Sequence, residues 1–535
     1  MDWLPAATAW GLLPLAVVLG VRRAPQAAVE APAWLGRVAV AVALAALGLS
    51  ALPHLTLPPL TFDDWWYAGL GAKLADGDLG VWRSAFTEHV HPSEPTVRPL
   101  IYIVLGVIAK TCGSAWLGWH LVSLALHLGA GALVFRLGLR LFDHRPAALL
   151  GAALWLAHPI HVETIGWLSA LEGPLLALSY LGAVCAHLER RWLVSGVLCA
   201  LALATKEAAV TLPGALVLVD LARPDVRLRD LPWRAYAISA GLVLAALGWR
   251  LALAEPDNAR MAAYLADLTT AGVPGLVHAL VVVAPRIVLA PLTTSVASFA
   301  PVFLVVLALT LSVSAAVATR VEGARTPRRW LAFAALWALG LLALSAWDLE
   351  VAEAPGIVGL VPSWKLRHAT LALVGPALVA ARLACAIPSR VAIAVVGLGL
   401  VAGAGTLLVV AAEVPAVAGQ RVVAAAGALE ALSEVPNAGV RVVEPEDPIA
   451  SLVLYRRLLE AQRASAPLLI GEPRCACARE ALAPPLPGAT LRAFSEWMHA
   501  PQRTPPLNPP GLCLCEYRRT DLRWYGWDGT RFVPD

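Results

Sequence analysis

Long apolar runs separated by short charged loops dominate the chain from its N-terminus to about residue 412. Many runs are about 15 to 25 residues long, which is close to the length that a helix needs to cross a bilayer. They lie at 7–21, 35–53, 99–111, 114–141, 146–158, 164–187, 192–205, 208–221, 235–253, 301–319, 330–347, 369–387 and 390–412. The pattern predicts an all-α polytopic membrane protein with about twelve transmembrane helices.

Basic residues in the connecting loops predict the orientation of these helices. Arginines fill every second loop, beginning with Arg22, Arg23 and Arg37, and arginine-rich loops stay on the cytoplasmic side of a membrane. The alternation is consistent along the chain if the apolar segment 276–291, which Pro285 and Pro291 interrupt, lies on the outer surface instead of spanning. We therefore expect the loop at 54–98 and everything after residue 412 to face outward, as on the periplasmic side of a bacterial inner membrane.

Composition supports this class. The chain is 59% hydrophobic and only 15% charged, whereas soluble domains carry about 25% charged residues. The net charge of +4 comes from loop arginines, so it is a signal of topology and indicates no nucleic-acid partner.

The character of the chain changes after residue 412, where prolines and charges become frequent. We predict a multi-spanning domain at 1–412 and a small soluble α+β domain outside the membrane at 413–535. Within this tail, residues 448–465 have the apolar spacing of a helix. Residues 512–533 have the pattern of strands, joined in a hairpin at Trp527-Asp528-Gly529.

The tail also holds two Cys-x-Cys pairs, Cys475 with Cys477 and Cys513 with Cys515. Such pairs could bind zinc, but zinc sites more often use a wider Cys-x2-4-Cys spacing. An outer location favours disulfides, with one pair bridging to the other.

The first outer loop begins with Phe62-Asp63-Asp64-Trp65-Trp66, which places two adjacent carboxylates just beyond an apolar helix. Acidic residues at a membrane boundary are costly, so they indicate a functional site unless they are well paired. The alternative is that they cap a helix within the loop, because Asp is a favoured N-cap residue.

Other ionisable residues gather at the predicted outer ends of the helices. They are Arg98, His158, Glu163, Lys206, Glu207, Lys365, Arg367 and His368. A pocket with acids and cations suits a phosphorylated amphiphile, since cations hold the phosphate and an acid can take a proton from an attacking hydroxyl. For each cation the alternative is a side chain that reaches into the lipid headgroups.

The order of these residues resembles a known family. After the acidic pair come Val97-Arg98-Pro99-Leu100, then His120 and His127, and then His158-Pro-Ile-His-Val-Glu163 and Lys206-Glu207. This order is similar to that of the GT-C membrane glycosyltransferases, and most closely to the transmembrane, TPR-containing O-mannosyltransferases, which use dolichyl-phosphate mannose. The resemblance covers residues from about 35 to 410. The tail has no 34-residue repeat, so the TPR repeats of that family are absent.

The resemblance implies a sugar donor, mannose or another hexose, carried on a polyprenyl phosphate, and a hydroxyl acceptor on a protein, glycan or lipid. It implies that Asp63 is the catalytic base of an inverting displacement, with Asp64 acidic beside it. Arg98, His158, Glu163, Lys206 and Glu207 would line or brace the site. Lys365, Arg367 and His368 would lie near the lipid phosphate, although they depart from the family's usual Arg-Tyr form. No cofactor is required; a divalent metal could bridge the acids and the phosphate, but we expect none.

Two other classes of function stay open. A transporter or flippase of lipid-linked saccharide would show internal repeats and charges near the mid-plane of the membrane. A structural scaffold that recruits partners through its tail would not depend on Asp63.

Lys206 gives a sharper expectation. It should face the pocket and meet Glu163, an acid of the first outer loop, or the donor phosphate, because a charged lysine at an apolar boundary needs a partner. Glu207 should point elsewhere, since neighbours on a helix do not share a face. The alternative is a lysine that extends into the headgroups.

Overall fold

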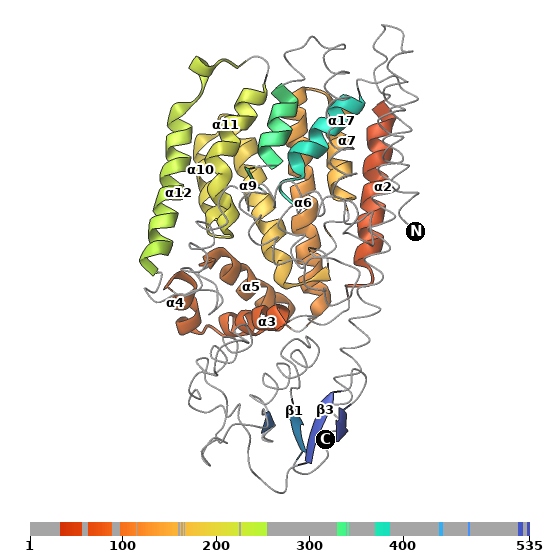
Figure 1. The fold of residues 1–535 in the computed structure, drawn as a ribbon, viewed down its shortest axis with the longest axis vertical. Coiled ribbons are helices and arrows are strands. Elements are labelled where there is room, and N and C mark those ends of the chain that lie inside the picture. Colours follow the sequence, from red (N-terminus) through yellow and green to blue (C-terminus); the bar gives the residue numbers. More distant parts are fainter. Residues whose placement is uncertain are drawn as a thin grey trace, which may run out of the picture. The chain divides into compact units, whose positions relative to one another are not determined.

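The structure, a computed structural model (Figure 1), describes most of the chain up to residue 253 and several later segments. The described residues are 33–55, 62–87, 97–113, 115–158, 161, 164, 166–223, 226–253, 329–338, 340–341, 370–385, 438–441, 469–470, 523–527 and 532–534. Several predicted elements lie outside them: the apolar segments 7–21, 276–291, 301–319 and 390–412, and the tail helix 448–465.

The chain divides into two compact units. One comprises Met1–Thr56, Leu117–Ala252 and Ala263–Glu413, and the other comprises Leu57–Trp116, Leu253–Ala262 and Val414–Asp535. The predicted domain boundary at 412/413 stays a prediction.

The first unit is a helical bundle whose helices follow the predicted apolar runs closely. They are α2 (Ala33–Ala51), α6 (Trp116–Phe142), α7 (Arg145–Leu156), α9 (Glu172–Leu188), α10 (Trp192–Leu203), α11 (Leu212–Ala222), α12 (Trp233–Leu253) and α17 (Val374–Ala384). Short 3-10 helices precede three of them: η2 (Ser169–Leu171) before α9, η3 (Glu207–Thr211) before α11 and η4 (Leu228–Asp230) before α12. Within the run predicted at 164–187, η2 leads directly into the long helix α9, which starts at Glu172.

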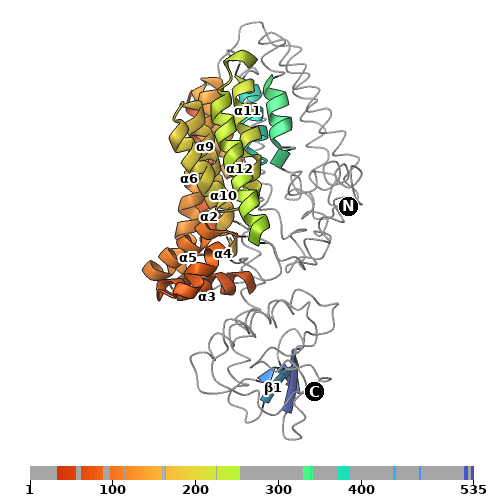
Figure 2. The ribbon, with the colours of Figure 1, turned by 90° about the vertical axis from the view of Figure 1, so that its left-hand side faces the viewer.

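The helices of the bundle run side by side, as both ribbon views show (Figures 1 and 2). Helices α2 and α17 pack on α7, while α10 and α11 pack on α9. Small residues permit the close approaches: a Cβ added at Gly138 would lie 2.7 Å from Leu378 Cδ2 and 3.1 Å from Ala148 Cα. Close packing over small residues is the usual way in which helices associate in a membrane.

Two buried tryptophans hold the turn before α17 in place. Trp155 Nε1 donates to the carbonyl of Thr370 (2.9 Å), and Trp337 Nε1 donates to the carbonyl of Leu371 (2.8 Å). Both rings are fully buried, and each satisfies its only polar atom. The bundle interior thus links segments that lie more than two hundred residues apart, as Trp155 and Thr370 do.

Large apolar side chains remain exposed along the helices of this unit, among them Trp34 and Leu49 of α2, Leu193 and Val197 of α10, and Leu244 of α12. In water such a surface would be unfavourable, but it suits contact with lipid. Within the described residues, three helices are long and apolar enough to cross a membrane: Trp34–Ala51, Trp116–Phe142 and Ser169–Leu188. The chain is a mostly helical integral membrane protein.

The described residues of the second unit include three short helices, α3 (Phe62–Ala75), α4 (Leu79–Thr87) and α5 (Pro99–Cys112). Helix α3 packs on α5. Asp78 caps α4, since its Oδ1 accepts from the backbone N–H groups of Gly80 (2.9 Å) and Val81 (3.2 Å). The segment predicted as an outer loop at 54–98 therefore contains two helices, which the sequence analysis did not predict.

The tail contributes four short strands to the second unit: β1 (Ala438–Arg441), β2 (Leu469–Ile470), β3 (Arg523–Trp527) and β4 (Phe532–Pro534). They form one mixed sheet in the order β2-β1-β3-β4, in which β1 is parallel to both neighbours. Strands β3 and β4 are antiparallel, and Trp527 pairs with Phe532. This pairing confirms the predicted hairpin partners, while β1 and β2 were not predicted.

Candidate functional site

The acidic pair lies inside a helix. Asp63 and Asp64 are the second and third residues of α3, where carboxylates interact favourably with the helix dipole. Asp64 is fully buried; of Asp63 only the backbone is described. The two acids therefore belong to the first turn of α3, and neither occupies the N-cap position, which directly precedes the helix.

Arg98 directly precedes α5 and is also buried. Pro99 starts the helix at its first position, where its missing N–H has no consequence. Asp64 and Arg98 are thus both held by short helices of the second unit.

Lys206 lies in the first unit, at the junction between α10 and η3, with an extended backbone (φ −158°, ψ 151°). Its ammonium forms an ion pair with the carboxylate of Glu172, the first residue of α9, through Nζ and Oε1. Lys206 is 6% exposed and Glu172 is 4% exposed. Lys206 therefore meets a carboxylate in the protein interior, as expected in kind, and the alternative of a lysine extending into the headgroups is wrong. The partner, however, was not predicted.

Glu207 turns to a different partner from its neighbour, as predicted. Its Oε1 lies 3.7 Å from Nη2 of Arg250, near the end of α12. The same Nη2 donates to the carbonyl of Leu203, the last residue of α10, at 2.7 Å. Glu172, Lys206, Glu207 and Arg250 thus form one set of alternating charges, which we call the Lys206 cluster. It joins α9, α10 and α12 at one end of the bundle.

A group of aromatic rings that includes two of the histidines in the motifs lies in the same unit. The His127 ring stacks on Trp155 (centroids 4.8 Å apart), and the His161 ring meets both edge-on at 4.2 and 4.5 Å. His161 Nε2 is 2.7 Å from the carbonyl of Trp155. Burial, together with the neighbouring His127 and His158, lowers the pKa of His161 well below its ordinary value. His161 thus packs against the rings of His127 and Trp155, and His158 beside it is half-buried.

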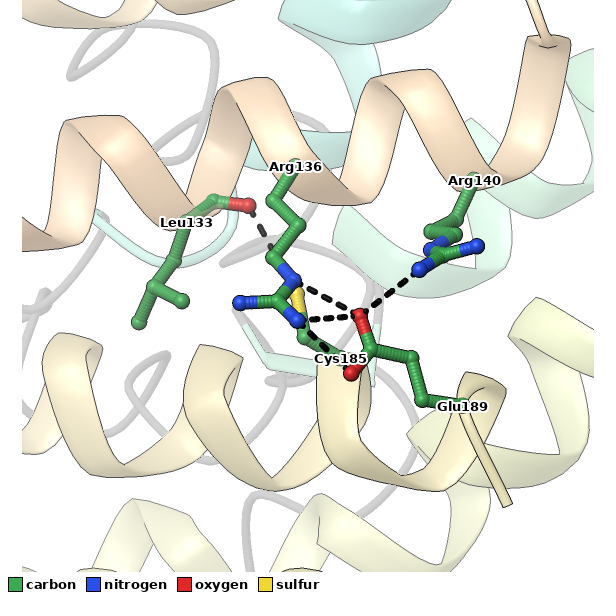
Figure 3. Close-up of polar contacts among 5 residues, drawn as sticks. All are labelled: Leu133, Arg136, Arg140, Cys185 and Glu189. Carbon is green, nitrogen blue, oxygen red and sulfur yellow. Dashed lines mark hydrogen bonds and ion pairs between the residues drawn. The ribbon is translucent and has the colours of Figure 1, made fainter. Parts of the chain in front are cut away.

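The opposite end of α9 carries a second ion cluster (Figure 3). Glu189 follows α9, and its carboxylate accepts from Arg136 Nε and Nη2 (2.7 Å each) and from Arg140 Nη2 (3.1 Å). The arginine side chains are 48% and 52% exposed. Burial raises the pKa of Glu189, but hydrogen bonds and charge from Arg136 and Arg140 outweigh it, so the pKa is lowered from its ordinary value. We call Arg136, Arg140 and Glu189 the Glu189 cluster.

Near this cluster, a buried carboxylate joins three helices. Asp220 of α11 lies 2.7 Å from Nε2 of His187, in the last turn of α9, and accepts from Tyr236 Oη of α12 at 2.6 Å. Asp220 and His187 are both buried.

Glu172 and Asp220 are the acids that the sequence analysis missed. Each lies inside an apolar run, at 164–187 and 208–221. A single acid within a predicted span is itself a signal of function or of a buried partner. The sequence contains that signal at both positions, but the predicted site residues all lie at the ends of the apolar runs or in loops.

The remaining predicted site residues lie outside the described residues: Glu163, Lys365, Arg367, His368, Cys475, Cys477, Cys513 and Cys515. Within the part of the chain that the structure describes, no group of three or more His, Cys, Asp or Glu side chains could hold a metal ion. The side chain of Asp63 is not among the described ones. The expectation that no divalent metal bridges the acids and the phosphate therefore stays a prediction.

An apolar helical bundle with buried charges at one end is the arrangement of an integral membrane protein that has a polar site at the ends of its helices. Some known membrane proteins are similar to this chain. No protein-family model matches the chain. It is 33% identical over 121 residues to protein O-mannosyl-transferase Tmtc1 of Drosophila melanogaster, covering 21% of this chain and 14% of that protein. It is 33% identical over 175 residues to Tmtc2 of the same organism, covering 30% of this chain and 17% of that protein.

Two solved structures are also similar. ArnT from Cupriavidus metallidurans bound to undecaprenyl phosphate has 16% identity and a TM-score of 0.44, covering 81% of this chain and 85% of that one. The Archaeoglobus fulgidus oligosaccharyltransferase in complex with zinc and sulfate has 13% identity and a TM-score of 0.33, covering 74% and 55%. The match spans no more than 17% of either curated relative. The matches to the two Drosophila proteins confirm the resemblance to transmembrane O-mannosyltransferases that the motifs indicated.

Proposed function

We propose that this protein is a membrane glycosyltransferase that moves a hexose from a polyprenyl-phosphate donor to a hydroxyl acceptor on the outer face of the membrane. The observation that carries the proposal is the similarity to protein O-mannosyl-transferases over 121 and 175 residues. The buried charges of Asp64, Arg98, Glu172, Lys206 and Arg250 support it, because charged groups among apolar helices are costly and are retained for function.

Asp63 is the proposed base. It accepts the proton of the acceptor hydroxyl while the hydroxyl oxygen attacks the anomeric carbon of the sugar. The bond between that carbon and the phosphate oxygen breaks, and polyprenyl phosphate leaves with the electron pair. Configuration at the anomeric carbon inverts.

The leaving phosphate gains negative charge in this step, so cations placed beside it lower the barrier. Arg98 and Lys206 are the described residues that we assign to this role, with Lys365, Arg367 and His368 as further candidates. Glu163, His158 and Glu207 brace the site. The outward orientation of the site and tail, and the disulfides among Cys475, Cys477, Cys513 and Cys515, belong to the same proposal.

The test uses the purified full chain in lipid nanodiscs with a mannosyl polyprenyl phosphate and a set of hydroxyl acceptors. Asp63→Asn keeps the size of the side chain but cannot accept the proton, so transfer should fall by about a hundredfold or more. Asp76→Asn is the matched control, because Asp76 is an exposed aspartate just after the same helix.

Equal turnover by Asp63→Asn and the wild type would exclude Asp63 as the base. If Asp64→Asn were fully active as well, the whole acidic site would be excluded. Movement of the lipid-linked sugar across the bilayer with no transfer would instead identify a flippase, and neither activity would favour a scaffold.

A further inference from the structure

The end of α7 leaves one buried carbonyl without its usual helical partner. The helix ends at Leu156, and the chain continues as Ala157-His158-Pro159-Ile160-His161. In an α-helix the carbonyl of Trp155 accepts from the backbone N–H four residues later, but that residue is Pro159, which has no N–H. Trp155 is fully buried, and a buried helix end needs donors from outside the helix. The sequence therefore requires another donor at this point.

The side chain of His161 supplies that donor. Its Nε2 lies 2.7 Å from the carbonyl oxygen of Trp155. Because a carbonyl only accepts, Nε2 carries the ring proton and donates it. The backbone N–H of His158 donates to the same oxygen at 3.2 Å, and the carbonyl of His158 accepts from the backbone N–H of His161 at 3.2 Å. The backbone that carries the His158 side chain is thus held on both sides.

Helix α6 holds the same segment in place. The fully buried ring of His161 meets the ring of His127, on α6, edge-on at 4.2 Å. Three residues beyond His161, the carbonyl of Thr164 accepts from Ser123 Oγ, also on α6, at 3.0 Å. The His161 ring therefore lies between the end of α7 and α6, where its N–H stays directed at the Trp155 carbonyl.

Packing alone does not explain a histidine at this position. A phenylalanine would fill a similar volume among the same rings, and it would bury no polar atom, which is costly unless a hydrogen bond compensates. Nδ1 of His161 has no hydrogen-bond partner within the part of the chain that the structure describes. One ring nitrogen is thus left unsatisfied while the other holds the turn, which makes the turn the reason for the histidine.

From these contacts we infer that His161 is a positioning residue of the proposed active site, because its ring N–H replaces the N–H that Pro159 lacks and so fixes the turn that carries His158. This inference rests on the proposed function and deepens it, since His158 is one of the residues that brace the proposed site. In this role His161 contacts neither the donor nor the acceptor and acts through the placement of His158.

Two substitutions separate the N–H of His161 from its ring. His161→Phe keeps a ring and removes the donor, whereas His161→Gln removes the ring and keeps an N–H donor close to the position of Nε2. Transfer by His161→Phe should fall about tenfold or more, mainly in kcat, because a small displacement of a site group slows the reacting step. His161→Gln should recover part of this loss. Wild-type transfer by folded His161→Phe, or equal losses in both variants, would overturn the inference.

Ser195→Ala is the matched control. Ser195 is buried, and its Oγ donates to a backbone carbonyl, that of Ala183, at 2.9 Å, between α10 and α9. The control should lower the midpoint of thermal unfolding and leave sugar transfer unchanged. A loss of transfer in Ser195→Ala as large as that in His161→Phe would show that any lost buried hydrogen bond has this effect, and would overturn the inference.

A double-mutant cycle tests whether His161 acts through His158. His158→Ala alone should reduce transfer. Addition of His161→Phe should then reduce transfer by less than about twofold more, because the two residues act as one unit. The fall in the unfolding midpoint that His161→Phe causes should be the same in both backgrounds. Losses of transfer that multiply would show that His161 acts independently of His158, and would overturn the inference.

Chemical modification of the histidines needs no sugar transfer, so it separates failure of the inference from failure of the proposed function. Diethyl pyrocarbonate modifies accessible imidazoles, and mass spectrometry of the full chain in nanodiscs locates each modified residue. His161→Phe should change the rate at His158 severalfold. The rate at His144, which is half-buried and directly precedes α7, should stay as in the wild type.

That result in a protein that transfers no sugar to any acceptor would remove the proposed function and leave the positioning of His158 by His161 standing. A wild-type rate at His158 in the His161→Phe variant would overturn the inference, and the proposed function would stand if the wild-type protein transfers sugar.

Discussion

The two ends of helix α9 carry the same chemistry in opposite surroundings. At its start Glu172 pairs with Lys206, and both side chains are buried. At its end Glu189 pairs with Arg136 and Arg140, whose side chains are about half exposed, at 48% and 52% (Figure 3). The pair at the start involves a lysine, whereas at the end Arg136 donates two parallel hydrogen bonds to the Glu189 carboxylate and Arg140 donates one more.

The difference shows which charges in a membrane protein invite a functional explanation. Half-exposed arginines near the end of a helix, beside a short loop, are expected from the rule that basic segments stay in the cytoplasm, and their pairing adds little. A buried lysine–glutamate pair has no such reason to exist, and removing one partner leaves the other charge uncompensated. The proposed site therefore lies at the Lys206 end of the bundle.

The largest effect should come from Lys206→Met. It leaves the Glu172 carboxylate buried without its countercharge, which should cost about 3–5 kcal/mol of stability. Thermal unfolding in a fixed detergent measures this loss. The double variant Lys206→Met, Glu172→Leu should recover most of it, because apolar groups replace the pair. A single variant as stable as the wild type would mean that the interior at this end is hydrated.

A smaller loss is expected from Asp220→Ala, which leaves the hydroxyl of Tyr236 and the ring of His187 without their common acceptor. Each unsatisfied buried group costs about 1–3 kcal/mol. Since Asp220 lies near the Glu189 end, the unfolding midpoint should fall while the donor KM stays normal. A raised donor KM in this variant would show that both ends of the bundle affect donor binding, and not the Lys206 end alone.

Arg250→Gln should have an intermediate effect on stability and a specific effect on the site. The variant removes the charged donor to the Leu203 carbonyl and the partner of Glu207, a loss of about 1–3 kcal/mol. Because the turn before Lys206 is then held less firmly, the donor KM should rise severalfold. Arg136→Gln, an arginine paired at the other end of the bundle, serves as the control. Equal kinetics of the two variants would contradict the role of Arg250.

Glu189→Gln should have the smallest effect, about 1 kcal/mol or less, since its partners are half exposed. Its pH dependence has a definite sign. The folded-state pKa lies below the ordinary value of about 4.5, so the stabilisation is complete above that value and is lost as the pH falls through the lower, folded-state value. The stabilities of the wild type and Glu189→Gln should therefore begin to converge as the pH falls below about 4.5, and they should coincide only below the folded-state pKa. Convergence already at neutral pH would show that the pair adds nothing.

The sequence alone determined the class of the protein and most of the helices that the structure describes in the first unit. Runs such as 35–53, 99–111 and 192–205 match α2, α5 and α10 to within two residues at either end, because apolar length is a local property that a bilayer selects directly. The antiparallel pairing of β3 with β4 was likewise visible, since a hairpin involves neighbours in the chain. The burial of Lys206 against a carboxylate, and the different partner of Glu207, also followed from the sequence.

Only the tertiary structure decided which charges meet. Glu172 and Lys206 are 34 residues apart, Leu203 and Arg250 are 47 apart, and Asp220 meets His187 across 33 residues. These contacts depend on how α9 packs against α10, α11 and α12, and no local pattern specifies such packing. In the sequence, Glu172 is a single acid inside an apolar run. Hydropathy reports only whether each residue favours water or an apolar environment, whereas the partner of Glu172 depends on which helix packs beside it.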